Sequence, residues 1–466
     1  MTGIPLIIVF ALAIVLMIIM ISKWRIHPFI SIMLVALGLG LIGGIPLVNK
    51  TDEAGETING LATVIGLGFS GTFTSIGIVI ILGALIGLIL EKTGAAFQIA
   101  DALVRVIGRK RPVLATQLMG WVVSIPVFCD SGFVILNPIR RALARRTGAS
   151  SVAMTVALSA GLYTSHVFIP PTPGPIAAAN TLGIGDNILI VIGIGTLVSI
   201  PALVVSYFYA QWIGKRITAN DEDEELDDAT LENLYEELRA SYGRLPGVGA
   251  SFLPILVPIL AMALGSIGSL FEWEGVLGDV VGFIGTPIIA LAIGVVFAVL
   301  VLGSVGRMTD FYDITDETLR VVGPILFITA AGGVLGRVIA STDLVAFIEE
   351  NATTFASVGL FFPFIIAAIL KTAQGSSTVA LVTTAGIVAP LLPALGLETP
   401  VQIALAVMAI AAGAMTVSHA NDSYFWVVTN FGGLTPQEGY KTQTMVTLIM
   451  GVTSIIVIWL LGLVFV

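Results

Sequence analysis

Two polar interruptions, each present in both halves of an otherwise apolar chain, decide the fold. In the first half they are Pro126-Val-Phe-Cys-Asp-Ser-Gly132 and Thr164-Ser-His-Val-Phe-Ile-Pro-Pro-Thr-Pro-Gly174. In the second half they are Lys371-Thr-Ala-Gln-Gly-Ser-Ser-Thr378 and Val417-Ser-His-Ala-Asn-Asp-Ser423. Polar side chains and broken backbone are costly in hydrocarbon unless they line a cavity. Matched interruptions in two halves therefore predict a substrate site near the middle of a membrane transporter.

The composition predicts a polytopic helical membrane protein. Of 466 residues, 56% are hydrophobic and only 11% are charged, and the mean hydropathy is +1.03. A soluble globular protein has about 25% charged residues. The single cysteine, Cys129, excludes a disulfide framework within the chain and a cysteine-rich metal site. The sequence has no basic tract that would indicate binding of nucleic acid. It also has no phosphate-binding glycine loop that would indicate binding of ATP, and no cofactor is expected.

Apolar runs of about 17–25 residues predict ten membrane crossings. The first run lacks the basic region and the cleavage site of a signal peptide, so it is interpreted as the first crossing. Lys23 and Arg25 follow it and predict a cytoplasmic loop, which places both termini outside. The expected crossings are 4–22, 29–46, 64–91, 151–181, 187–213, 250–271, 279–303, 321–341, 400–430 and 444–465.

Two further apolar stretches are expected to be helical hairpins that enter the membrane and return. The stretch 112–139 has arginines and lysines at both ends, so both ends are expected in the cytoplasm. The stretch 357–394 is flanked by glutamates, so both of its ends are expected outside. Arms of roughly 10–15 residues reach about 15–22 Å. The hairpin tips are expected near 126–132 and 374–378.

These features predict two repeats of opposite orientation. Ser131 corresponds to Ser376, and Ser165-His166 to Ser418-His419; Gly87 and Thr93 have the spacing of Gly336 and Thr342. Each half has five crossings, and because five is an odd number the two halves must have opposite orientations in the membrane. The predicted fold is therefore an all-α polytopic membrane protein with two inverted-topology repeats. Each repeat has five transmembrane helices, one re-entrant helical hairpin and a broken helix at the midplane. The expected domains are 1–213 (hairpin 112–139, broken helix 151–181), a cytoplasmic acidic linker at 214–248, and 249–466 (hairpin 357–394, broken helix 400–430).

The linker is the only long polar segment. It holds seven acidic residues between Asp221 and Asp228, and a short helix is expected near 228–241. The linker is either a solvated connector or a regulatory segment. Segments 95–107 and 304–320 are expected to be amphipathic at the inner membrane surface.

Asp130 is the only acid in the first hairpin. A charge at membrane depth costs several kcal/mol unless it faces water, a counter-ion or a bound substrate. Asp130 is therefore either a proton acceptor or coupling-ion ligand, or a carboxylate that caps the turn at Ser131 and Gly132. His166 and His419 lie at equivalent breaks, where a histidine either titrates and donates to an anion or is structural.

The remaining polar groups fit a carboxylate with hydroxyl groups. A helix that begins near 375–378 could hold a carboxylate with its first amides, although hydroxyl groups there could instead bond between helices. Thr172 lies in a proline run that cannot form a regular helix, and Asn180 follows on the resumed helix. Lys371 either neutralises a substrate carboxylate, pairs with an acid, or extends to the membrane surface.

The sequence resembles the gluconate permease (GntP) family of bacterial secondary transporters, within the ion transporter superfamily. The resemblance covers essentially the whole chain and depends on four motifs in order. They are Pro126-Val-Phe-Cys-Asp-Ser-Gly-Phe133, His166-Val-Phe-Ile-Pro-Pro-Thr-Pro-Gly-Pro175, Ala373-Gln-Gly-Ser-Ser-Thr-Val-Ala380 and Ser418-His-Ala-Asn-Asp-Ser-Tyr-Phe-Trp426.

The resemblance implies proton-coupled uptake of gluconate, related sugar acids or D-serine across the inner membrane of a prokaryote. It also implies a homodimer with a scaffold and an elevator-like transport domain in each protomer. The chain departs from the family at two places near the implied site. Gluconate-type members carry Glu in the segment that corresponds to Asp130, and commonly His where this chain has Thr172.

We therefore predict a proton-driven symporter, and not an enzyme, for a small hydroxylated monocarboxylate such as gluconate. Its expected partners are that carboxylate, protons and the lipid bilayer. Asp130, His166 and Asp422 are the expected proton-coupling residues, with Asp130 first. The alternatives are sodium-coupled uptake of a carboxylate or D-serine, a channel-like facilitator, and an integral-membrane enzyme. The expected substrate-binding residues are Ser131, Gly132, His166, Thr172, Asn180, Gln374, Gly375, Ser376, Ser377, Thr378, His419, Asn421 and Asp422.

Overall fold

The computed structural model describes residues 4–51, 55, 57–108, 110–219, 236–237, 239–344, 347 and 359–465. Within these residues the chain is mostly helical, and the only sheet is an antiparallel pair, β1 (Lys50–Thr51) and β2 (Thr57–Ile58). The predicted acidic block at 221–228 lies outside the described residues, as does most of the helix predicted at 228–241.

The first half has its breaks where the sequence predicts them. Its helices are α1 (Ile4–Ser22), α2 (Pro28–Ile42), α3 (Leu61–Thr72), the π-helical turn η1 (Phe73–Gly77), α4 (Ile78–Lys92), α5 (Ala95–Ile107), α6 (Pro112–Val123), α7 (Cys129–Thr147), α8 (Ser151–Phe168), α9 (Pro173–Thr181), η2 (Gly185–Asn187) and α10 (Ile188–Ile213). The crossing predicted at 64–91 is one helical run that contains η1. The next helix, α5, is bent by 69° from α4.

The helices of the second half differ from the prediction in two places. Its helices are α13 (Val248–Leu270), α14 (Gly275–Gly285), α15 (Pro287–Ser304), η3 (Met308–Asp310), α16 (Phe311–Ala340), α19 (Phe361–Gln374), α20 (Ser377–Val388), η4 (Ala389–Leu391), η5 (Pro393–Leu395), α21 (Pro400–Met415), α22 (Ser423–Phe431), α23 (Pro436–Gly439), η6 (Tyr440–Thr444) and α24 (Met445–Phe465). The crossing predicted at 279–303 is wrong at its start, because Pro287 begins a new helix after α14 has ended. The crossing predicted at 321–341 begins earlier, because the 30-residue α16 starts at Phe311 and includes most of the segment predicted to be amphipathic at 304–320.

Six described helices are long and apolar enough to cross a membrane, or seven if the bent pair α4–α5 is one span. The other apolar helices among the described residues have 10–17 residues and include α2, α6, α19 and α21. Large apolar side chains point outward on several long helices: Leu260 is 64% exposed, Leu300 61% and Leu463 62%. A soluble monomer rarely exposes such surface, so these faces are suited to contact with lipid.

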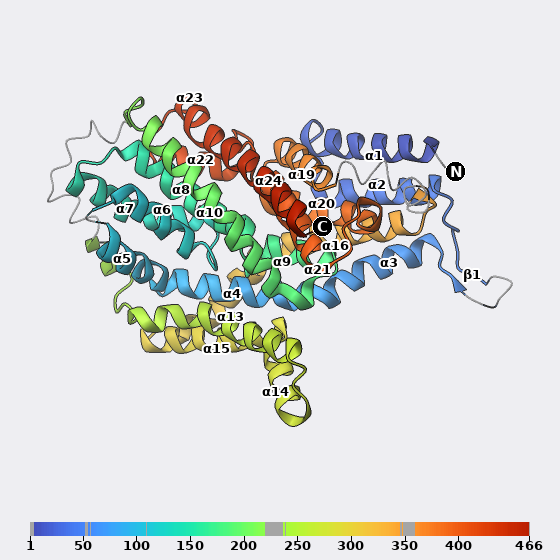
Figure 1. The fold of residues 1–466 in the computed structure, drawn as a ribbon, viewed down its shortest axis with the longest axis horizontal. Helices are drawn as coiled ribbons and strands as arrows, with labels where there is room; N and C mark the ends of the chain where they lie inside the picture. Colours follow the sequence, from blue (N-terminus) through green and yellow to red (C-terminus); the bar gives the residue numbers. More distant parts are fainter. Residues whose placement is uncertain are drawn as a thin grey trace.

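The core of the molecule lies around α8 and α21. All 18 residues of α8 are buried, and α21 is buried over most of its length. Each is packed against the first arm of a helix pair, α6 on α8 and α19 on α21, and α10 packs on α24 between the halves (Figure 1). The break after α8 therefore lies in the interior of the protein, whereas the break after α21 is partly exposed, at Asn421 and Ser423.

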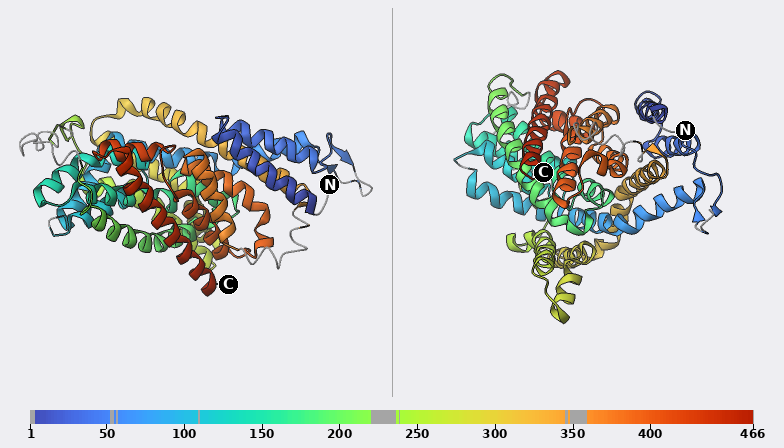
Figure 2. Two further views of the ribbon diagram at one scale, coloured as in Figure 1. Left: turned by 90° about the horizontal axis from the view of Figure 1, so that it is seen from above. Right: turned by 45° about the vertical axis from the view of Figure 1, so that its right-hand side comes forward.

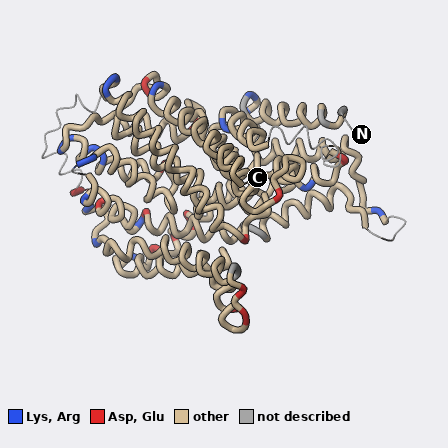
Figure 3. The backbone as a smooth tube through the Cα atoms, viewed as in Figure 1, with Lys and Arg blue, Asp and Glu red and all other residues tan. Residues whose placement is uncertain are grey.

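Two further features of the arrangement are a projecting layer of helices and a basic end of the molecule. The helices α13, α14 and α15 form a layer that projects from the bundle, below α4 in Figure 1 and again in the right view of Figure 2. Lys and Arg residues gather at one end, beside α5 and α7 (Figure 3). An end rich in Lys and Arg is typical of the cytoplasmic side of a membrane protein.

Candidate functional site

The first helix pair turns at the predicted place. The helix α6 ends at Val123, and the Ser124 hydroxyl donates to the Val127 carbonyl at 2.8 Å before α7 begins. This turn lies against α4 at Gly87, where a Cβ would come within 2.0 Å of the Pro126 carbonyl oxygen. A side chain at Gly87 would displace the turn, so the glycine permits this close contact.

Asp130 lies in the first turn of α7 and contacts the second half of the chain. The Ser423 hydroxyl, from α22, donates to Oδ1 of Asp130 at 3.2 Å. The Cys129 thiol lies 3.6 Å from Oδ2. Among the described residues, no cation forms an ion pair with this carboxylate. Asp130 thus joins the first hairpin to the second break through neutral groups.

The second helix pair turns at Gly375, which has a left-handed φ of +88°. A Cβ there would lie 2.0 Å from the Asn421 carbonyl oxygen, so the turn packs directly on the break between α21 and α22. Ser376 caps α20, because its hydroxyl accepts from the Val379 amide at 3.3 Å. The amides of Ser377 and Thr378, in the first turn of α20, have no helical carbonyl to bond.

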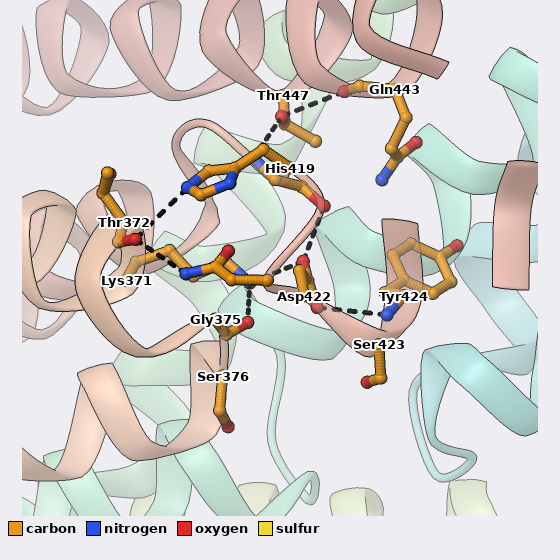
Figure 4. Close-up of polar contacts among 12 residues, drawn as sticks. Lys371, Thr372, Gly375, Ser376, His419, Asp422, Ser423, Tyr424, Gln443 and Thr447 are labelled. Carbon is orange, nitrogen blue, oxygen red and sulfur yellow. Dashed lines mark hydrogen bonds and ion pairs between the residues drawn. The ribbon is translucent and has the colours of Figure 1, made fainter. Parts of the chain in front are cut away.

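A buried ion pair joins this turn to the second break (Figure 4). Lys371 is 1% exposed, and its Nζ lies 2.6 Å from Oδ2 of Asp422. The same ammonium donates to the Gly375 carbonyl. Asp422 also accepts from the Ser418 hydroxyl at 2.6 Å and from the Tyr424 amide at 3.1 Å, which caps α22. Of the roles predicted for Lys371, pairing with an acid is the one that the structure contains.

His419 and Asn421 bond to the backbone of the same helix pair (Figure 4). Asn421 Nδ2 donates to the Thr372 carbonyl at 2.7 Å, and His419 Nε2 lies 3.2 Å from the same oxygen. On the other side of the break, the Ser418 amide donates to Thr447 on α24 at 2.9 Å. The break is therefore held between α19 and α24.

The first break places its predicted residues differently. The Thr172 hydroxyl donates to the carbonyls of His166 and Ile169, both at 2.9 Å, and so satisfies backbone groups that the prolines leave free. The His166 ring lies 5.8 Å from that of Phe128 in the first hairpin turn. Asn180 donates to the Ile176 carbonyl and lines a separate cavity. The structure therefore does not bring Asn180 together with the buried ion pair.

Two more predicted residues have partners of their own. Ser131 lies near the Glu91 side chain at the end of α4. The Gly132 amide donates to the Phe128 carbonyl at 2.8 Å. The first hairpin turn is closed by bonds of its own and contacts the second break through Asp130 and Ser423, whereas the second turn shares several bonds with that break.

Several polar atoms near these turns are buried without a partner among the described residues. They are the Tyr163 hydroxyl, Nδ1 of His166 and both amide atoms of Gln374. The Tyr163 ring lies 5.7 Å from Nζ of Lys371. A buried polar group without a hydrogen bond costs about 1–3 kcal/mol, so these groups are suited to a ligand that supplies the missing bonds.

Comparison with known proteins shows which family this chain resembles over its whole length. Residues 4–464 match the family described as GntP family permease. The inner membrane permease YgbN of Escherichia coli is 33% identical over 465 residues, which cover 98% of this chain and 99% of YgbN. The gluconate permease of Zymomonas mobilis is 30% identical over 458 residues, 96% of each chain. The solved structure of Neisseria gonorrhoeae MtrF, from a class of antimetabolite efflux pumps, superposes with a TM-score of 0.62 at 17% identity and covers 95% of both chains.

This chain belongs to the GntP family of permeases. It is a polytopic membrane transporter and not an enzyme. In this GntP permease, sequence reasoning missed Tyr163, Ser418 and Tyr424 as contributors to the polar cluster. A signal existed for Ser418, which neighbours a predicted histidine. Tyr424 stands in the motif Ser418–Trp426 but, like Tyr163, was not singled out, because an aromatic residue in an apolar helix is usually part of the core.

Proposed function

We propose that this chain is a proton-coupled symporter that imports a small hydroxylated monocarboxylate of the gluconate type. The observation that supports this most directly is Lys371, a buried cation at the meeting point of the second hairpin turn and the second break. The Lys371 ammonium already pairs with Asp422 and donates to the Gly375 carbonyl, so a substrate carboxylate would accept from its third N–H. The similarity to the gluconate permease of Zymomonas mobilis supports the substrate class.

In this proposal the substrate carboxylate binds beside Lys371 and the first amides of α20, at Ser377 and Thr378. A helix N-terminus favours an anion without a second formal charge. The unpartnered groups of Tyr163, His166 and Gln374 are then available to bond the substrate hydroxyls. His419 and Asn421 position the backbone of this site through Thr372.

Asp130 is the proposed proton carrier, and Asp422 and His166 are the second choices. Asp130 is held by the neutral groups of Ser423 and Cys129, so it can take a proton without the loss of an ion pair. Protonation of Asp422 would leave the buried Lys371 ammonium without its counter-charge. The proton taken up by Asp130 and the substrate anion bound beside Lys371 together add no net charge to the protein when it crosses.

The proposed architecture is two inverted repeats at 1–213 and 249–466, joined by the cytoplasmic linker 214–248, with both termini outside. Matched contacts support it, because α2 packs on α16 where α15 packs on α4. The pairs α6–α7 and α19–α20 would be re-entrant hairpins that move with the broken helices as a transport domain. A homodimer with elevator-like movement is part of this proposal.

The experiment that tests the function is uptake of labelled gluconate, glycerate and D-serine into sodium-free proteoliposomes. Accumulation that requires an inward proton gradient is the expected result, and its pattern identifies the substrate. Accumulation only after sodium is added would make the protein a sodium symporter. Equilibration without accumulation under any gradient would make it a facilitator.

A further inference from the structure

A cavity away from the ion pair is lined by one cationic side chain, that of the exposed residue Arg337. It has a volume of about 340 Å³ and is bounded by α3, the end of α9, the last turns of α16, and the end of α20 with η4. Small-molecule sites have volumes of about 300–1,000 Å³. Arg337 is the only charged residue among the described residues that line it, and Asn180 and Thr72 add polar groups.

Arg337 has no ion-pair partner among the described residues. Two other arginines near the same helix are paired, Arg307 with Asp310 at 2.7 Å and Arg320 with Asp316 at 2.8 Å. A guanidinium that lines a cavity without a carboxylate attracts anions, and its fork of donors matches a carboxylate.

The repeat indicates that packing does not require this charge. Gly87 and Thr93 correspond to Gly336 and Thr342, so the position that corresponds to Arg337 is Leu88. Leu88 is partly buried against the apolar core. A basic residue in the last turn of α16 also interacts favourably with the helix dipole. That interaction would be the same for an arginine on any face of the helix, whereas Arg337 lines the cavity.

The cavity is connected to the ion-pair site by one helix. Gly386 lines the cavity, and Ser377 begins the same helix at the second hairpin turn. Nine residues of helix span roughly 14 Å, so the two places are distinct. In the proposed topology this end of α20 lies on the outer side of the membrane.

We propose that this cavity is an outer docking site for a small carboxylate, in which Arg337 binds the anion and Asn180 bonds its polar groups. The carboxylate is held there before it reaches Lys371. The identity of the ligand, but not the anion site itself, rests on the proposed function.

The test places a cysteine reporter at Ala340, an exposed residue that lines the cavity one turn from Arg337. The reporter cysteine is treated in proteoliposomes with two thiosulfonate reagents, one that carries an anionic sulfonate and one that carries a cationic ammonium group. The two reaction rates are compared. The parent protein, in which Cys129 is buried, gives the background. The ratio of anionic to cationic rates is expected to fall roughly five- to tenfold with Arg337→Gln and to be unchanged by the matched control Arg320→Gln. A ratio unaffected by Arg337→Gln would overturn the proposal.

Two further measurements separate this site from the proposed function. Arg337→Gln is expected to raise the KM for gluconate about fivefold with kcat retained, and Arg337→Lys to restore part of the loss. A loss of kcat with KM unchanged would contradict a docking role. A wild-type protein that fails to transport gluconate but shows the charge-dependent labelling would overturn the substrate and support the anion site.

Discussion

Lys371 and Asp422 form a buried ion pair, and each residue needs the other to stay charged. The pair is fully buried, and Asp422 has two further donors, from Ser418 and Tyr424. Each group therefore keeps the other charged in surroundings where an isolated charge is costly. The pair also fixes the second hairpin turn, because the same ammonium bonds the Gly375 carbonyl.

Replacement of Lys371 by Met is expected to destabilise the protein by about 3–5 kcal/mol, because Asp422 is left as a buried unpaired charge. Thermal unfolding in detergent measures this effect. The double variant Lys371→Met/Asp422→Asn is expected to recover part of the stability. The control is Lys92→Met, which removes a half-exposed pair with Glu317 and should cost about 0–1 kcal/mol. Equal losses in the two single variants would contradict the assigned role of the pair.

Asp130→Asn is expected to abolish proton-driven accumulation and to retain exchange of labelled for unlabelled substrate. The amide keeps an oxygen for the Ser423 hydroxyl but carries no proton between the two sides. Proteoliposomes measured in both modes separate the two activities. Asp310→Asn, in η3 and partly exposed, is the control. Normal accumulation by Asp130→Asn would move the coupling role to another group.

At the scale of residues, the sequence predicted which polar groups lie at the breaks but not which way they point. Asp130 and Asp422 were predicted because acids are rare at membrane depth. Asn180 faces a different cavity from the ion pair, since the helix that resumes after the proline run sets its direction. No periodic pattern survives such a break, so the rotation of α9 could not be derived from the chain.

The elements were predicted well where glycine or proline ends a helix. Both helix pairs turn within the expected segments, near Pro126 and at Gly375. The crossing predicted at 279–303 failed because α14 and α15 are both apolar, and hydropathy does not register the short break before Pro287. The bounds of α16 were missed because its polar first turns continue directly into the apolar part.

Gly375→Ala tests the contact between the second turn and the second break. The change adds a left-handed strain of roughly 1–2 kcal/mol and a Cβ 2.0 Å from the Asn421 carbonyl oxygen. The free energy of unfolding is therefore expected to fall more than in the control, Gly396→Ala. At Gly396 φ is +70°, and no atom lies within 4 Å of an added Cβ. Transport is expected to fall only in Gly375→Ala. Equal behaviour of the two variants would show that the contact is not required.

At the scale of the whole molecule, the account requires the second hairpin to move against α16. A disulfide between Gly336→Cys and Gly386→Cys links the two, where a Cβ on Gly336 would lie 3.7 Å from the Gly386 Cα. Oxidation is expected to stop uptake and reduction to restore it. The control pair, Gly265→Cys and Gly285→Cys, joins α13 to α14 within one layer and should leave uptake unchanged. Full transport with the first link formed would exclude the movement.

The most direct test of the central claim is the proton flux that accompanies substrate. Liposomes that hold the purified protein and a pH-sensitive dye are exposed to an outside excess of gluconate, without sodium and without an imposed pH gradient. Coupled symport predicts that the lumen becomes acidic as gluconate enters, and that Asp130→Asn abolishes the acidification. Entry of labelled gluconate without any acidification of the lumen would contradict proton coupling.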